Sequence, residues 1–217
     1  MLQFRCTAKV QKEIGIKPKD LNEITDGKSM LGNWYVNIST IDRRKAFLFV
    51  NERTLLSFIL YGIKKSNIAN MHEMFLKALN QLLLIEGVDY PVIDKLNNEY
   101  LHLEYTKTNS KQVLGNMNDL MSLYKHFIYS DGGLKYCDLT EIIHQINKTP
   151  QKNIGWSYSI DLVKKSCCST TKAHNKSING DRKKRVALFQ TLCVFEKQFH
   201  FRPGEFECVK FNISPIN

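Results

Sequence analysis

Three consecutive basic residues, Arg43, Arg44 and Lys45, have the clearest potential for chemistry in this chain. They lie in the segment IDRRK at 41–45, between two apolar segments. Guanidinium groups match the oxygen geometry of phosphate, so the triplet could hold a phosphate group. Charged residues also favour solvated turns, and a plain hairpin turn is the simpler interpretation.

A second polar segment, TKTNSK at 106–111, precedes a predicted helix and contains Lys107 and Lys111. The free N–H groups and the dipole at a helix N-terminus attract anions. The segment lacks the glycines of a P-loop, so the pattern does not predict nucleotide binding by that mechanism. Ordinary capping of the helix by Asn109 or Ser110 explains most of the composition.

Asp119, with Asn116 and Asn118 beside it, could act as a general base or as a metal ligand. A single carboxylate makes a poor metal site. Asp42 and Glu52 could join it in space, but the simpler interpretation is a polar surface or a contact with a partner. The sequence therefore predicts no metal site, and a Ser/His/Asp arrangement would have to be chosen arbitrarily.

The six cysteines, at positions 6, 137, 167, 168, 193 and 208, form no C-x-x-C pair. The six histidines show neither H-x-x-x-H nor H-E-x-x-H spacing. These patterns suggest neither a zinc site nor a disulfide framework, and we expect reduced thiols and no cofactor. Trp34, Tyr35 and Trp156 are interpreted as core or rim aromatics rather than base-stacking platforms.

Residues 110–129 are expected to form a strongly amphipathic helix. Its apolar positions recur at helical spacing and are Val113, Leu114, Met117, Leu120, Met121, Tyr124, Phe127 and Ile128. Gly115, Asp119 and Gln112 project from the opposite side, with Lys111 and Asn118 beside them. A glycine inside a helix costs about 1 kcal/mol relative to alanine, so we interpret this outward face as a contact surface.

The remaining pattern predicts an α+β fold with a small, mainly antiparallel sheet packed against several helices. Alternating apolar residues predict strands at 2–8, 34–41, 46–50 and 101–105, with a turn at 42–45 joining the middle two. Helical spacing and capping residues predict further helices at 9–14, 55–62, 71–85, 91–98 and 138–146.

The net charge of +10 over 217 residues is concentrated in one segment. Residues 164–185 hold eight Lys or Arg against Asp181, a local charge of +7, which leaves about +3 for the other 195 residues. We interpret this Ser/Thr/Asn/Lys-rich segment as a basic linker rather than a dedicated nucleic-acid arm. The predicted organisation is an α+β domain at 1–163, the linker at 164–185 and a C-terminal extension at 186–217.

No apolar run reaches the 18 residues of a membrane span, and the N-terminal residues place charge where a signal peptide needs an apolar stretch. These features predict a cytoplasmic protein. The hydrophobic content of 43% is enough for a packed core.

Five sequence blocks, in order along the chain, resemble a bacterial family classed only as a domain of unknown function. They are RCT at 5–7, LGNWY at 31–35, IDRRK at 41–45, NERT at 51–54 and TKTNSKQVLGNMNDL at 106–120. The resemblance covers about residues 1–161 and implies a soluble α+β domain. It brings no assigned activity, cofactor or catalytic residue, and residues 164–217 lie outside it.

The absence of a catalytic pattern favours an interaction module over an enzyme. The expected partner is nucleic acid, bound through the basic hairpin tip and the basic linker at 164–185, or an unidentified protein. The expected binding residues are Arg43, Arg44, Lys45, Lys107, Lys111, Gly115, Asn118 and Asp119. The alternative is an enzyme of a toxin or defence type that hydrolyses a phosphodiester or nucleotide, with Asp119 and either Asp42 or Glu52 as catalytic carboxylates.

Overall fold

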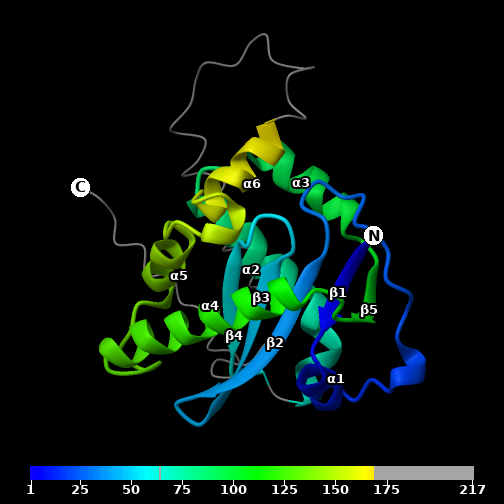
Figure 1. Cartoon of the computed structure of the whole chain (residues 1–217), viewed down its shortest axis with the longest axis horizontal. Helices are drawn as coiled ribbons and strands as arrows, with labels where there is room; N and C mark the ends of the chain where they lie inside the picture. The colour runs from blue at the N-terminus through cyan, green and yellow to red at the C-terminus, as the bar shows by residue number, and fades with distance from the viewer. Residues whose placement is uncertain (64, 169–217) are drawn as a thin grey trace, which may run out of the picture.

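A five-stranded mixed sheet forms the centre of the domain in the computed structural model, which describes residues 1–63 and 65–168 (Figure 1). The strands are β1 (Leu2–Cys6), β2 (Trp34–Ile41), β3 (Arg44–Asn51), β4 (Ser57–Tyr61) and β5 (Leu103–Lys107), in the spatial order β4-β3-β2-β1-β5. Strands β2, β3 and β4 pair antiparallel, whereas β1 lies parallel to both β2 and β5. The sheet is mostly antiparallel, and the predicted α+β fold class is confirmed.

Helices cover both faces of this sheet (Figure 1). The described α-helices are α1 (Ala8–Ile14), α2 (Met71–Ile85), α3 (Tyr90–Glu99), α4 (Lys111–Ser130), α5 (Leu139–Asn147) and α6 (Ser159–Cys168). Short 3-10 helices occupy Pro18–Asp20, Lys65–Asn70 and Lys152–Ile154. No helix in the described ranges is long and apolar enough to cross a membrane.

The face toward α2 is an aromatic core. Phe75 of α2 packs its ring 4.8 Å from Phe4, 5.1 Å from Trp34 and 5.2 Å from Phe49, measured between ring centroids. Strand alternation places these side chains on one side of the sheet, where their mutual packing adds to the gain from burial. The interpretation of Trp34 as a core aromatic is confirmed, whereas Trp156 is 68% exposed.

The opposite face is divided into an apolar half and a polar half. The strand registers align Arg5, Tyr35, Val50 and Ser57 in one row across β1, β2, β3 and β4. At the β3–β4 end, α4 packs against the sheet, and its buried Tyr124 hydroxyl lies 3.2 Å from Ser57 Oγ. At the β1 end, the same row is polar, and this difference positions the candidate site described below.

The prediction of a helix at 55–62 is wrong, because this segment is the edge strand β4. Asn51 Oδ1 accepts hydrogen bonds from the backbone N–H groups of Arg53 and Thr54, as a capping residue would. These bonds close a turn instead, in which Leu55 adopts a positive φ of 57°. The residues SFILY then pair with β3, a long-range contact that a local pattern does not encode.

Several predicted boundaries differ from the structure by one or two residues, and the differences at the two basic segments concern the candidate sites. The hairpin turn is shorter than 42–45, because only Asp42 and Arg43 have positive φ and Arg44 already belongs to β3. Helix α6 runs to Cys168, so the first residues of the predicted linker at 164–185 are helical. The rest of that segment and the extension at 186–217 lie outside the described residues.

Candidate functional site

Helix α4 connects two polar regions of the domain. Its N-cap is Ser110, whose Oγ accepts the Val113 N–H at 3.3 Å. Twenty residues at 1.5 Å each give α4 a length of about 30 Å. Asn109, just before its start, contacts Arg5 and Tyr35 at one end of the sheet, whereas Tyr129, in its last turn, contacts the β2–β3 turn.

The outward face of α4 is exposed as predicted. It consists of Lys111, Gln112, Gly115, Asn118 and Asp119. A Cβ placed on Gly115 would meet no atom within 4 Å, so close packing does not require this glycine. Asn116 does not belong to this face: it is 7% exposed, and its Oδ1 accepts a hydrogen bond from Asn153. Asn116 is therefore engaged inside the domain, whereas Asp119 faces outward.

Asp42 fixes the β2–β3 turn to the loop after α4. Its Oδ2 accepts the Leu134 N–H at 2.5 Å, and its own N–H lies 3.4 Å from the Tyr129 hydroxyl. The carboxylate lies so close to Gly133 that a Cβ there would collide with it. This clamp holds the basic turn against the C-terminal end of α4.

The clamp brings exposed basic and aromatic side chains into one region, which we call the tip surface. It consists of Arg43, Arg44, Tyr129, Lys135 and Tyr136. Tyr129 is 52% exposed and Tyr136 is 71% exposed. Lys135 Nζ lies 5.1 Å from the centroid of the Tyr136 ring, and the Arg44 guanidinium lies 5.9 Å from the Tyr61 ring. Lys45 instead contacts Glu13, with 2.5 Å between Nζ and Oε1.

The structure distributes the other predicted site residues along α4 and the hairpin. Lys107 and Lys111 lie near the N-terminal end of α4, about 30 Å from the tip surface. Asp42 and Glu52 lie at opposite ends of the eight-residue strand β3, about 30 Å apart at 3.3 Å per residue. Asp119 lies on the outward face between them, so these three carboxylates do not form one site.

Glu52 belongs instead to a network around the buried Arg5, which we call the polar cleft. Arg5 Nη1 lies 3.0 Å from Glu52 Oε2 and 2.8 Å from Asn109 Oδ1. The hydroxyl of the buried Tyr35 donates to the same Asn109 oxygen at 2.5 Å. These four side chains come from β1, β2, the turn after β3 and the residue before the α4 cap.

The loop between the Pro18–Asp20 helix and β2 closes one side of the polar cleft. Arg53 donates to the carbonyl oxygens of Gly27 and Ser29, and Arg5 Nη2 donates to Thr25 O at 3.1 Å. Gly32 has a φ of 73°, and a Cβ there would lie 2.8 Å from Arg53 Nε and from Glu52 Oε1. Only glycine therefore fits at position 32, beside the Arg53 guanidinium and the Glu52 carboxylate.

Sequence reasoning missed Arg5, Tyr35 and Asn109 as members of a common site. The sequence pattern places Tyr35 in the core or at its rim and indicates for Asn109 only the role of a helix cap. The signal comes from the structure: Arg5 is a charged residue in a strand whose five residues are all buried. A buried charge requires partners, so this position indicates a polar network inside the fold.

Cys6 and Cys137 are free thiols with raised pKa values. Burial raises the pKa of Cys6 to about 12, and burial is also the main cause of a raised pKa at Cys137. Cys167 is buried as well. Within residues 1–63 and 65–168, no three His, Cys, Asp or Glu side chains are grouped to hold a metal ion.

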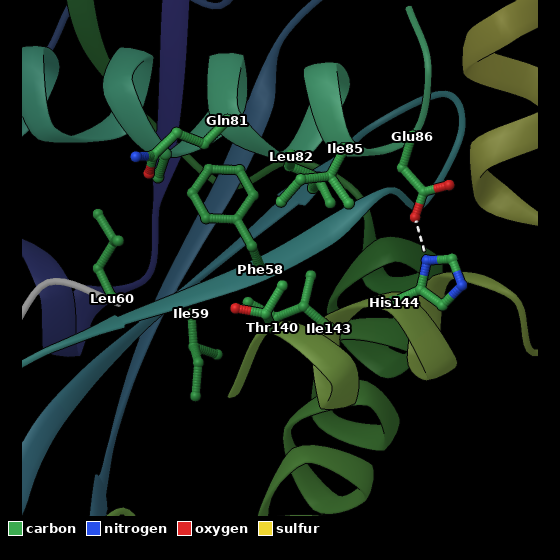
Figure 2. A pocket seen from close by; sticks show the side chains of 11 residues that line it. Phe58, Ile59, Leu60, Gln81, Leu82, Ile85, Glu86, Thr140, Ile143 and His144 are labelled. Carbon is green, nitrogen blue, oxygen red and sulfur yellow. Dashed lines mark hydrogen bonds and ion pairs between the residues drawn. The ribbon is translucent and has the colours of Figure 1, made fainter. Parts of the chain in front are cut away.

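An apolar pocket lies between β4, α2 and α5 and includes Phe58, Leu82 and Ile143 (Figure 2). At its rim, His144 Nδ1 lies 2.5 Å from Glu86 Oε1, which ties α5 to the end of α2. The pocket has a volume of about 20 Å³, room for about one water molecule. It is a packing defect of the core rather than a ligand site.

The chain matches the family described as "Domain of unknown function (DUF6933)" over residues 3–162 and belongs to it. No curated protein matches the chain. Four of the five sequence blocks noted above supply residues to the polar cleft, namely Arg5, Tyr35, Glu52 with Arg53, and Asn109 with Ser110. The fifth block, IDRRK at 41–45, forms the hairpin turn of the tip surface.

Proposed function

We propose that this domain is an interaction module that binds single-stranded nucleic acid through the tip surface. The observation that carries the proposal is the combination of the exposed residues Arg43 and Arg44 with two exposed tyrosines, one in the last turn of α4 and one on the clamped loop after it. Arginine forks match phosphate oxygens, and exposed aromatic rings stack on bases that are not paired.

The clamp supports the proposal because it fixes the spacing of these groups. Asp42 holds the turn that carries Arg43 against the loop that carries Lys135 and Tyr136. A ligand backbone that contacts the arginines would therefore meet the tyrosines without first ordering a free loop. The basic segment at 164–185 would add an attraction that depends on charge alone.

The enzymatic alternative, hydrolysis of a phosphodiester or nucleotide, would need Asp119 together with Asp42 or Glu52. Asp42 accepts a backbone hydrogen bond at the tip, Glu52 pairs with Arg5, and Asp119 faces outward between them. A binding function therefore requires less rearrangement of this fold than a catalytic one.

The test is the binding of a fluorescent mixed-sequence single-stranded oligonucleotide to the full-length protein over a series of salt concentrations. We expect Tyr136→Ala to weaken binding about tenfold, which is the loss of affinity expected when one base no longer stacks on an aromatic ring. Arg43→Ala should also reduce the logarithmic salt slope by about 0.7, the value of one phosphate contact. Tyr90→Ala and Lys95→Ala alter similarly exposed residues on α3 and are the matched controls.

A further variant, with glutamines replacing the basic run at 182–185, separates the tip surface from the linker. If the linker alone binds, this variant loses affinity while Arg43→Ala and Tyr136→Ala do not. No binding by the full-length protein at low salt would refute the proposal and make a protein the expected partner of the outward α4 face. Cleavage of the oligonucleotide would favour the enzyme.

A further inference from the structure

We infer that the polar cleft, at the opposite end of α4 from the tip surface, binds a small-molecule oxyanion, a carboxylate or phosphate group. The cleft has a volume of about 460 Å³, within the range of sites for small ligands. Its walls come from segments far apart in the sequence, including Arg5, Tyr35, Glu52 and Asn109.

Arg5 provides the strongest indication of a ligand. Its side chain lines the cleft and is 7% exposed, and Nη1 and Nη2 are bonded to Glu52, Asn109 and Thr25. Its Nε has no hydrogen-bond partner among the described residues. A buried donor without a partner is costly, and an unfilled ligand or ion site is one explanation for it.

Two further donors lie beside this guanidinium. Asn109 is an exposed residue whose Oδ1 accepts from Arg5 and Tyr35, so its Nδ2 group remains available to donate. Ser110 Oγ accepts the Val113 N–H, which leaves its hydroxyl hydrogen for a ligand. Both residues sit at the N-terminus of α4, where the helix dipole favours a negative group.

The charge balance of the cleft limits which oxyanion fits. Arg5 and Arg53 carry two positive charges, and Glu52 and Asp26 carry two negative charges, so the lining is formally neutral. A group with a single negative charge can accept hydrogen bonds from these donors without strong repulsion from Glu52 and Asp26. We therefore expect a carboxylate to bind more tightly than a doubly charged phosphate.

The experiment is an NMR titration of the isotope-labelled full-length protein with sodium acetate and, separately, sodium phosphate, at constant ionic strength set by sodium chloride. We expect saturable shifts of the Asn109 side-chain amide and the Ser110–Val113 backbone amides. A response to acetate identifies a carboxylate, a response to phosphate alone identifies a phosphate ester, and either supports the site. No saturable shift with either probe, or shifts centred elsewhere, would overturn it.

Asn109→Asp sharpens the test, because it keeps the oxygen that Arg5 and Tyr35 contact and replaces the donor group with a negative oxygen. We expect at least about tenfold weaker binding of the anion, the effect of losing a charge-assisted hydrogen bond. Asn98→Asp makes the same change at an exposed position of α3 and should bind as the unaltered chain does. Equal affinity in the two variants would count against the site, and the wild-type shift map decides the matter if Asn109→Asp does not fold.

Discussion

The two ends of α4 hold their charged side chains in opposite states of solvation. In the polar cleft, the guanidinium of Arg5 and the hydroxyl of Tyr35 are buried and joined by short hydrogen bonds. On the tip surface, Arg43 and Tyr136 are exposed, and the segments that carry them are joined by the hydrogen bond from the Leu134 N–H to Asp42. The same helix therefore supports a rigid polar interior at one end and a solvated basic surface at the other.

This difference determines what each end can recognise. Buried groups with fixed geometry can discriminate a small ligand by shape and hydrogen bonding, because their desolvation is completed on folding. A single ion pair between exposed charges contributes little binding free energy. Several such pairs along an extended polyanion together give a substantial affinity. Substitutions at the two ends should therefore differ in their effect on stability.

The largest effect is expected inside α4, which supports both ends. Met117 is fully buried, and Met117→Asp should lower the free energy of unfolding by more than about 5 kcal/mol because it buries an unpaired charge. Asp119→Ala, on the exposed face, should change it by less than about 0.5 kcal/mol. Thermal melts of both variants measure this, and similar losses would contradict the assignment of the two faces.

Arg5→Leu should have the next largest effect, a loss of about 3–5 kcal/mol, because it leaves the Glu52 carboxylate without its charged partner. Adding Glu52→Leu should recover part of this loss, since the unpaired charge is then removed as well. Chemical denaturation of the single and double variants tests the coupling. If the two losses simply add, the Arg5–Glu52 pair does not stabilise the cleft.

At the tip, Gly133→Ala should lower stability by about 2–3 kcal/mol. The added Cβ meets the Asp42 carboxylate, and the positive φ of 96° is unfavourable for alanine. Gly62→Ala is the matched control, because Gly62 has a φ of 75° but no neighbour within 4 Å, and should lose about 1 kcal/mol. Denaturation curves and faster amide exchange at Leu134 would report release of the clamp.

A smaller effect on stability is expected from His72, which contacts Tyr100 near the polar cleft. Its Nε2 lies 2.8 Å from the Tyr100 carbonyl oxygen, and the Tyr100 hydroxyl donates to Gly32 O beside Glu52 and Arg53. Partial burial lowers the pKa of His72 below its usual value of about 6.5.

Because this pKa is lowered, the unfolded chain binds a proton more readily than the folded chain. The stability that neutral His72 contributes is present above about pH 6.5 and declines as the pH falls through its folded-state pKa. The melting temperature should therefore fall less between about pH 7.5 and about pH 5.5 in His72→Gln than in the unaltered protein. An identical pH dependence in both proteins would contradict this assignment.

Reducing agent and chelator should have the smallest effect, no change in melting temperature. Cys6 and Cys137 are free thiols, and the described part of the chain groups no metal ligands. A marked loss of stability with either reagent would show that residues outside the described ranges form a disulfide or hold a metal ion.

Most elements could be predicted because their signals are local. Helix α4 begins one residue after the predicted start, and α2 and β2 match their predicted bounds. Helical spacing, strand alternation and capping residues act over a few residues, so these elements do not depend on distant contacts. Strand β4 was not predicted because, among the described residues, it pairs with β3 alone, and the turn before it resembles a helix cap.

The candidate sites were only partly predictable. The sequence indicated the basic hairpin turn and the exposed face of α4, since both depend on local charge and helical period. It could not show that Asp42 clamps the loop after α4 rather than joining Glu52, or that Glu52 pairs with Arg5. Those contacts join residues that are far apart in the sequence, at least the 47 positions that separate Arg5 from Glu52.

By itself, then, the sequence determined the α+β class, the helical and strand periods, and the side chains that had to be buried. Tertiary structure decided which polar residues meet, because β1 lies between β2 and β5 and brings Arg5 beside Tyr35 and the start of α4. The physical reason is that apolar burial is nonspecific and follows from local pattern, whereas a hydrogen bond or ion pair needs two particular groups within about 3 Å. Only the complete chain topology provides that proximity.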